Sequence, residues 1–164
     1  MADTRILTFT DKKKLEEQLA QLNEEKKRVA EEIQVARGFG DLSENAEYDE
    51  AKKEQAKVQE QINRLQATIR TATFVDDSVV DTTTAALGTV VRVLDLEYDE
   101  EDEYTLVGFT EADPSKLYIS NESPIGIALC DTDGKGTGAK VGDIVEANTP
   151  GGIIKLKVLS IRKR

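Results

Sequence analysis

Histidine and tryptophan are absent from the 164 residues, and cysteine occurs once, as Cys130. Without histidine the chain cannot build a Ser-His-Asp or Cys-His catalytic arrangement. One cysteine cannot form a disulfide within the chain and leaves too few ligands for a Cys/His zinc site. Carboxylates are therefore the side chains left for chemistry at a site.

Apolar residues, and aromatic residues above all, are scarce as well. Apolar residues make up 38% of the chain and aromatic residues 5%, which disfavours one large core and favours an elongated or two-part molecule. The N-terminal stretch MADTRILTFTDKKK lacks the apolar segment of a signal peptide, and no run is long enough to span a membrane. We therefore expect a cytoplasmic protein that does not bind membranes.

The net charge of -10 is unevenly distributed. Residues 1–75 hold 13 Lys and Arg against 15 Asp and Glu, whereas residues 76–164 hold 9 against 17. Tight, sequence-independent binding to nucleic acid relies on many basic contacts to phosphates. The balance argues against such binding and limits any nucleic-acid contact to a local one, or one shared with a protein partner.

Glycine and proline are missing from residues 1–37 and 41–87, and both segments carry apolar residues at alternating spacings of four and three, which predicts heptad helices. The first stripe is Leu15, Leu19, Leu22, Val29, Ile33 and Ala36, and the second is Tyr48, Ala51, Val58, Ile62, Leu65 and Ile69. Two such helices joined by a short bend predict an antiparallel coiled-coil hairpin over residues 1–75. A first helix over Asp11–Arg37 would be ~40 Å long.

Each stripe has one polar member, Lys26 in the first and Gln55 in the second. Buried polar residues in such a seam can fix the register of the two helices. The alternative is that the long Lys26 side chain reaches the surface.

After a predicted linker at residues 76–87, the periodicity becomes twofold, which predicts strands. The five strand-like runs are TVVRVLDLE, YTLVGF, KLYISN, DIVEAN and IIKLKVLSIR. The sequence TPGG predicts a hairpin turn between the last two, and SPIGIALC predicts a short helix capped by Ser123 with Pro124 in its first turn. We therefore expect residues 88–164 to form an α+β domain, an antiparallel sheet with one short helix, in which the acidic run at 97–103 is most simply a solvated loop.

The bend between the helices is unusually acidic, with the sequence GDLSENAEYDE. If Asp41 is the N-cap of the second helix, Glu44 occupies the third helical position, the spacing of a capping box. The same two carboxylates point to one side of a helix start and form half of a site for a hard cation such as Mg²⁺, which takes one or two protein carboxylates. Spacing alone favours capping without further function.

Three motifs carry a resemblance to a known family. These are GDLSENAEY in the bend, NESPIGIAL at 121–129 and VGDIVEANTPGG at 141–152. In order and spacing, over nearly the whole chain, the sequence resembles the bacterial GreA/GreB transcript cleavage factors. The sequence differs from the family at two places. The stretch DTDGKGTGAK, 131–140, is longer and richer in glycine than the matching family stretch. Asp49 and Glu50 make the start of the second helix more acidic than is expected of the family.

The resemblance implies a fold and a function. The hairpin would enter the secondary channel of RNA polymerase, and an FKBP-like C-terminal domain would dock at the channel rim. Asp41 and Glu44 would hold a second Mg²⁺ beside the polymerase's own acids and so stimulate its cleavage of backtracked RNA. Tyr48 would help to position the RNA 3′ end or the metal, although its heptad position equally predicts a seam residue. Lys52 and Lys53 are candidate RNA contacts, with a solvated helix face as the alternative.

Several other functions remain open from the sequence. A related protein could occupy the same channel and inhibit or regulate transcription without cleavage, although the presence of both Asp41 and Glu44 speaks against it. An FKBP-like domain also suggests a peptidyl-prolyl isomerase, but such sites use an aromatic-lined pocket and this sequence has few aromatic residues. A prefoldin-like chaperone arm is least compatible with the sheet domain. We expect no enzymatic activity and no small-molecule substrate.

Overall fold

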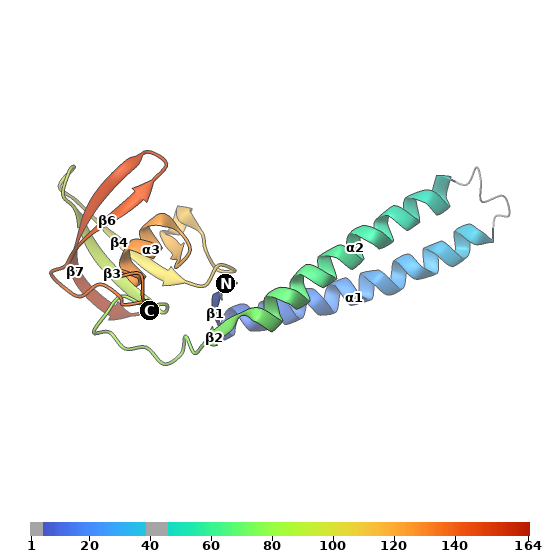
Figure 1. Ribbon diagram of the computed structural model, residues 1–164, viewed down its shortest axis with the longest axis horizontal. Coiled ribbons are helices and arrows are strands. Elements are labelled where there is room, and N and C mark those ends of the chain that lie inside the picture. The colour runs from blue at the N-terminus through green and yellow to red at the C-terminus, as the bar shows by residue number, and fades with distance from the viewer. Residues whose placement is uncertain (1–4, 39–45) are drawn as a thin grey trace. The chain divides into compact units, whose positions relative to one another are not determined.

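A computed structural model describes residues 5–38 and 46–164 of the chain (Figure 1). The chain divides into two compact units. The first contains Lys12–Thr73, and the second contains Leu7–Asp11 together with Phe74–Arg164. The predicted fold class, a helical hairpin followed by an α+β sheet domain with a short helix, is confirmed.

The first unit is a pair of long helices, α1 (Phe9–Arg37) and α2 (Ala46–Thr71), which run side by side (Figure 1). Val29, Ile33 and Ala51 form a buried cluster between them. Their burial follows the predicted heptad stripes, and removing such apolar surface from water is the main force that pairs two amphipathic helices.

The polar members of the two stripes behave differently from each other. Lys26 is exposed, so its side chain reaches the surface and does not occupy the seam. Gln55 is half-buried, and its Oε1 accepts a hydrogen bond from Lys52 at 3.4 Å. The idea that Lys26 fixes the register is therefore wrong, and its surface alternative holds.

Helix α1 begins at Phe9, two residues before the predicted start, because Thr8 and Asp11 form a capping box. The N–H of Asp11 donates to Thr8 Oγ1 at 2.9 Å, and the N–H of Thr8 donates to Asp11 Oδ2 at 3.0 Å. Within the second unit, Thr110 also donates to Asp11 Oδ1, from its N–H at 3.2 Å and its hydroxyl at 2.5 Å. Asp11 is fully buried, and these bonds satisfy its carboxylate.

The second unit is built on a five-stranded sheet in the order β5-β4-β3-β7-β6. Its strands, each of which matches a predicted run, are β3 (Thr89–Asp95), β4 (Glu100–Val107), β5 (Tyr118–Ser120), β6 (Ile144–Thr149) and β7 (Gly152–Lys163). All pairings are antiparallel except that of β4 with β5, which is parallel, so the prediction of an antiparallel sheet is wrong for this one pair. A short 3₁₀ helix, Pro114–Lys116, lies in the connection that makes the parallel pairing possible.

Helix α3 (Pro124–Cys130) packs beside the sheet and closes its core. Ser123 caps it as predicted, because its Oγ accepts the Gly126 N–H at 3.1 Å, and Pro124 lies in the first turn. The core combines residues of α3 with alternate residues of the strands: Val91, Val93, Leu106, Ile119, Ala128, Leu129, Val145, Ala147, Leu156 and Val158. The predicted turn between β6 and β7 is confirmed, since Thr149 pairs with Gly152.

The acidic run at 97–103 is only partly a loop, because β4 begins at Glu100. Its acidic side chains stay exposed and form cross-strand ion pairs on one face of the sheet. Arg92 pairs with Glu101, and Arg162 pairs with Glu103 at 3.5 Å. The loop prediction is thus wrong for residues 100–103, where basic side chains of β3, the neighbouring strand, and of β7, the next strand along, make a charged strand favourable.

Two short strands were not predicted from the sequence. Strands β1 (Ile6–Thr8) and β2 (Thr73–Val75) form a separate two-stranded sheet. The segment predicted as a linker, residues 76–87, lies in the second unit, where Ala85 is 2% exposed and belongs to the core.

Within residues 5–38 and 46–164, no helix is both long enough and apolar enough to cross a membrane.

Candidate functional site

The residues predicted to act together come from the bend and the start of α2. Asp41 and Glu44 lie outside the residues that the structure describes. Tyr48, Lys52 and Lys53 lie in the first two turns of α2. The structure therefore describes the helical flank of the predicted site, and the metal-binding roles of the two acids stay predictions.

Tyr48 is half-buried and packs against the cluster formed by Val29, Ile33 and Ala51. The guanidinium carbon of Arg37 lies 6.0 Å from the centre of the Tyr48 ring, at the limit of a cation–π contact. The side chain thus occupies its heptad position in the seam and meets the end of α1. Its implied role toward RNA stays a prediction.

Lys52 and Lys53 are both exposed on α2. The Lys52 ammonium donates to Gln55 one turn along the helix. Such exposed cations suit either a solvated helix face or a phosphate contact, so RNA binding by the pair stays a prediction.

A groove lies between the two helices at the same end of the hairpin, with a volume of about 500 Å³. Its floor is apolar, and its walls carry acidic side chains from both helices together with one arginine. The lining residues are Arg28, Glu31, Glu32, Val35, Ala36, Glu47, Glu50, Ala51 and Glu54. The acids of α2 are spaced three and four residues apart, a signal of one shared helix face that the sequence analysis did not use.

Arg28 is the cation lining this acidic groove. Its guanidinium donates to Glu54 of the opposite helix at 2.9 Å and also pairs with Glu32 on its own helix. The hydrogen bond to Glu54, followed by the charge of Glu32, raises the pKa of Arg28 above its usual value. The other charged residues that line the groove are all acidic, so the groove carries an excess of negative charge.

No group of three or more His, Cys, Asp or Glu side chains is placed to bind one metal ion within residues 5–38 and 46–164. The prediction for Asp41 and Glu44 falls outside these residues.

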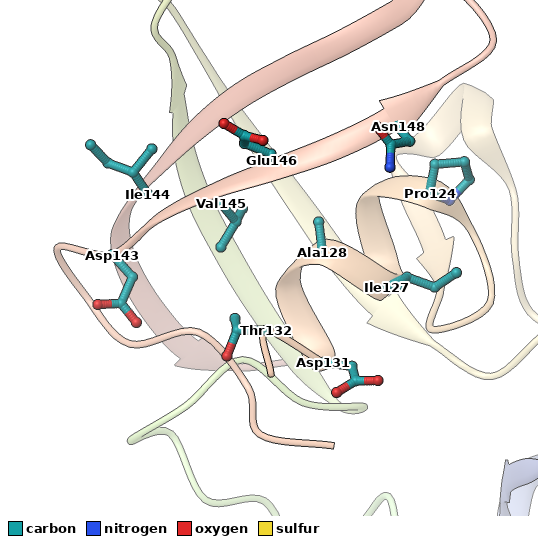
Figure 2. A pocket seen from close by; sticks show the side chains of 10 residues that line it. All are labelled: Pro124, Ile127, Ala128, Asp131, Thr132, Asp143, Ile144, Val145, Glu146 and Asn148. Carbon is teal, nitrogen blue, oxygen red and sulfur yellow. The ribbon is translucent and has the colours of Figure 1, made fainter. Parts of the chain in front are cut away.

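A second groove, of about 530 Å³, lies in the sheet unit between α3 and β6 (Figure 2). Ile127, Ala128 and Val145 give it an apolar wall, and Asp131, Asp143 and Glu146 add three carboxylates; Pro124, Thr132, Ile144 and Asn148 complete the lining. Sequence analysis missed this groove, because it depends on the placement of α3 against an edge strand.

Cys130, at the end of α3, is a poor nucleophile. Burial, assisted by the nearby charge of Asp131, raises the pKa of its thiol to about 12. The thiolate, which is the reactive form, is therefore rare at neutral pH.

We expect iodoacetamide at pH 8 to alkylate Cys130 about a thousandfold more slowly in the folded protein than in urea, as the shift in thiol pKa requires. Mass spectrometry of timed samples measures both rates on this single cysteine. Equal rates in the two conditions would show that the thiol is not protected.

Comparison with known proteins decides the family. The family model "Transcription elongation factor, N-terminal" matches residues 5–73, and "Transcription elongation factor, GreA/GreB, C-term" matches residues 80–163. The chain belongs to the GreA/GreB family of transcription elongation factors. In this GreA/GreB family member, the N-terminal family model covers the helical hairpin, and the C-terminal family model covers most of the sheet unit.

Individual relatives agree with the family models. Transcription elongation factor GreA of Clostridioides difficile is 52% identical over 159 residues, 96% of each chain. The GreA of Acetivibrio thermocellus is 49% identical over 159 residues, again 96% of each chain.

Solved structures of related proteins include GreA factor homolog 1 (Gfh1) of Thermus thermophilus, with 24% identity, a TM-score of 0.43 and coverage of 97% of this chain and 99% of that one. GreA/GreB of Nitrosomonas europaea shares 27% identity, with a TM-score of 0.39 and coverage of 61% and 78%.

Proposed function

We propose that this protein binds RNA polymerase, inserts the end of its helical hairpin into the secondary channel and stimulates the polymerase's own cleavage of backtracked RNA. The observation that carries the proposal is the order of the matched parts. The N-terminal family model covers both helices of the hairpin, and the bend between them holds Asp41 and Glu44. The protein is then a donor of ligands to another enzyme's centre.

The two acids suit Mg²⁺ by their chemistry. Carboxylate oxygens are hard donors, and Mg²⁺ characteristically takes one or two of them from one protein and leaves its other positions to water, phosphate or a partner. When bound, the ion would stabilise charge on the oxygens of the phosphodiester during hydrolysis. Asp41 and Glu44 would hold it, and Tyr48 would position the RNA end beside them.

The acidic groove supports this role by its charge. Five carboxylates, those of Glu31, Glu32, Glu47, Glu50 and Glu54, line it, against the single guanidinium of Arg28. Summed negative charge raises the local concentration of cations. The hairpin end would therefore favour the delivery of Mg²⁺ while offering little attraction to RNA phosphates, so the polymerase must hold the RNA.

The proposal is tested with stalled elongation complexes that contain 3′-labelled, backtracked RNA. We expect the purified protein to release labelled 3′ fragments at least about a hundredfold faster than polymerase alone, a barrier reduction of ~2.7 kcal/mol. Gel electrophoresis of timed samples measures both the rate and the fragment length. The surviving complexes should resume synthesis when nucleotides are added.

Two controls separate the proposal from its rivals. The protein without polymerase should leave the same RNA intact, because two carboxylates alone bind Mg²⁺ poorly in water. Inhibition of RNA synthesis without any released fragment would instead support the non-cleaving regulator that occupies the same channel.

A further inference from the structure

The groove between α3 and β6 runs along a free sheet edge. Strand β6 ends the sheet order, so it pairs with β7 on one side only. The carbonyl of Lys155 in β7 accepts from Leu96, on the side away from β6, and in an antiparallel strand the N–H and C=O of one residue point to the same side. Its partner Glu146 therefore directs its own N–H and C=O away from β7.

The same alternation applies along the strand. Ile144 and Asn148 share the orientation of Glu146, whereas the backbone groups of Val145 and Ala147 face β7. All three outward residues line the groove. The groove thus offers a row of backbone donors and acceptors, the template to which an extended chain can add as a further strand.

Both walls of the groove carry apolar side chains. Figure 2 shows Ala128 of α3 and Val145 of β6 directed toward each other, with Ile127 farther along the helix. Ile127 and Ile144 are 50% and 58% exposed although both are large and apolar. Aliphatic side chains at different positions of a bound strand would cover Ile127 and Ile144.

The negative charge of the groove favours a bound segment with basic side chains. Asp131, Asp143 and Glu146 line the groove, and its lining includes no Lys or Arg. Each of these carboxylates has a partner within the protein: Gly136 N–H binds Asp131 at 2.7 Å, Lys140 N–H binds Asp143 at 3.0 Å, and the exposed Glu146 pairs with Lys155 of β7 at 3.7 Å. Pairing of two copies through β6 would bring their Glu146 side chains close together, and like charges across strands are unfavourable.

We propose that this groove binds an extended segment of a partner protein that adds to the free edge of β6 and carries alternating aliphatic and basic side chains. The backbone of the segment pairs with Ile144, Glu146 and Asn148. Its aliphatic side chains contact Ile127, and its basic side chains face the three carboxylates. The site lies within the sheet unit, and the proposal does not depend on RNA cleavage.

A fluorescein-labelled peptide, acetyl-Lys-Val-Lys-Val-Lys-Val-amide, is the probe, and fluorescence anisotropy with the full-length protein measures its affinity. We expect Glu146→Lys to weaken binding at least about tenfold, which corresponds to ~1.4 kcal/mol. Glu97→Lys makes the same charge change at an exposed residue outside the groove and should alter affinity less than about twofold, as expected of a distant surface charge. Equal losses in both variants would overturn the proposal.

A second pair of variants tests the apolar wall. Ile127→Ser should weaken binding, whereas Ile153→Ser, at a similarly exposed position of β7 outside the lining, should not. Circular dichroism checks that each variant remains folded. Retained affinity in Ile127→Ser would count against the groove.

Strand addition itself has two direct readouts. Binding should slow amide hydrogen exchange at Glu146 and Asn148 at least about tenfold by NMR, because bound donors exchange only after the added strand opens. Methylating the peptide nitrogens on alternate residues should abolish binding for one of the two alternating sets and spare the other. Binding without these effects, or self-association of the protein through β6 by analytical ultracentrifugation, would overturn the proposal.

Discussion

Replacing Asp41 by Asn is expected to reduce RNA cleavage in stalled polymerase complexes by about 100- to 1000-fold, because the proposed ligand to the ion that would stabilise the reacting oxygens becomes neutral and weaker. The melting temperature should stay within about 2 °C of the parent, because Asn caps a helix about as well as Asp. Timed cleavage assays and thermal unfolding measure the two quantities on the same preparations.

Two further variants sharpen this result. Glu44→Gln should cause a similar loss of cleavage, since it removes the other predicted ligand. Glu50→Gln, which neutralises an acid of the groove between the helices, should reduce cleavage less than about tenfold, as expected of charge lost outside the predicted ligands. If complexes with the Asp41→Asn variant cleaved RNA as fast as those with the parent protein, the acidic bend would cap the helix and have no further function.

Replacing Gly126 by Ala is expected to destabilise the sheet unit by about 3 kcal/mol, the upper part of the range for overpacking a core. A Cβ at this position would lie 1.8 Å from the backbone carbonyl oxygen of Ser120. Helix α3 would have to move away from β5, because a backbone atom at the end of a strand cannot rotate aside. Urea unfolding followed by circular dichroism measures the loss.

Gly151→Ala is the matched control. A Cβ there would meet only Thr149 Oγ1, at 3.9 Å, which is ordinary contact. The free energy of unfolding should change by less than about 0.5 kcal/mol, as for most surface substitutions. If Gly126→Ala were as stable as Gly151→Ala, the tight approach of α3 to β5 would not exist in solution.

The helices and most strands follow from sequence because their patterns are repetitive. In the heptad stripes, such as the one that contains Val29 and Ile33, an apolar residue recurs about once per helical turn, so several residues together mark the same buried face. Likewise, the alternation of Val145 and Ala147 with exposed neighbours defines one buried face of β6. Such signals need no knowledge of the partner element.

Features that depend on a distant partner were missed or misjudged. The start of α1 at Phe9 depends on Asp11, whose carboxylate is held by Thr110, far away in the chain. The acids at the start of β4 are acceptable in a strand because they pair with Arg92 on the neighbouring strand β3 and with Arg162 on β7, the strand beyond it. Charge runs predict exposure correctly, but they do not distinguish a loop from the exposed face of a sheet.

Only part of the candidate site could be predicted from the sequence. Its residue types, and the metal they suit, could be proposed from the bend, because ligand chemistry is a property of the side chains themselves. The acidic groove required the structure, since it joins Glu31 and Glu32 of one helix with residues of another. The groove beside β6 required knowledge of which strand ends the sheet.

The strand order also bears on how the protein folds. The helices of the hairpin follow each other directly, so their contacts close short loops of chain. By contrast, Thr89 of the central strand β3 pairs with Lys163 of β7, and closing so long a loop carries a larger entropic cost. Proteins dominated by such non-local contacts fold more slowly. During refolding, amides of the hairpin should therefore become protected before those of the sheet.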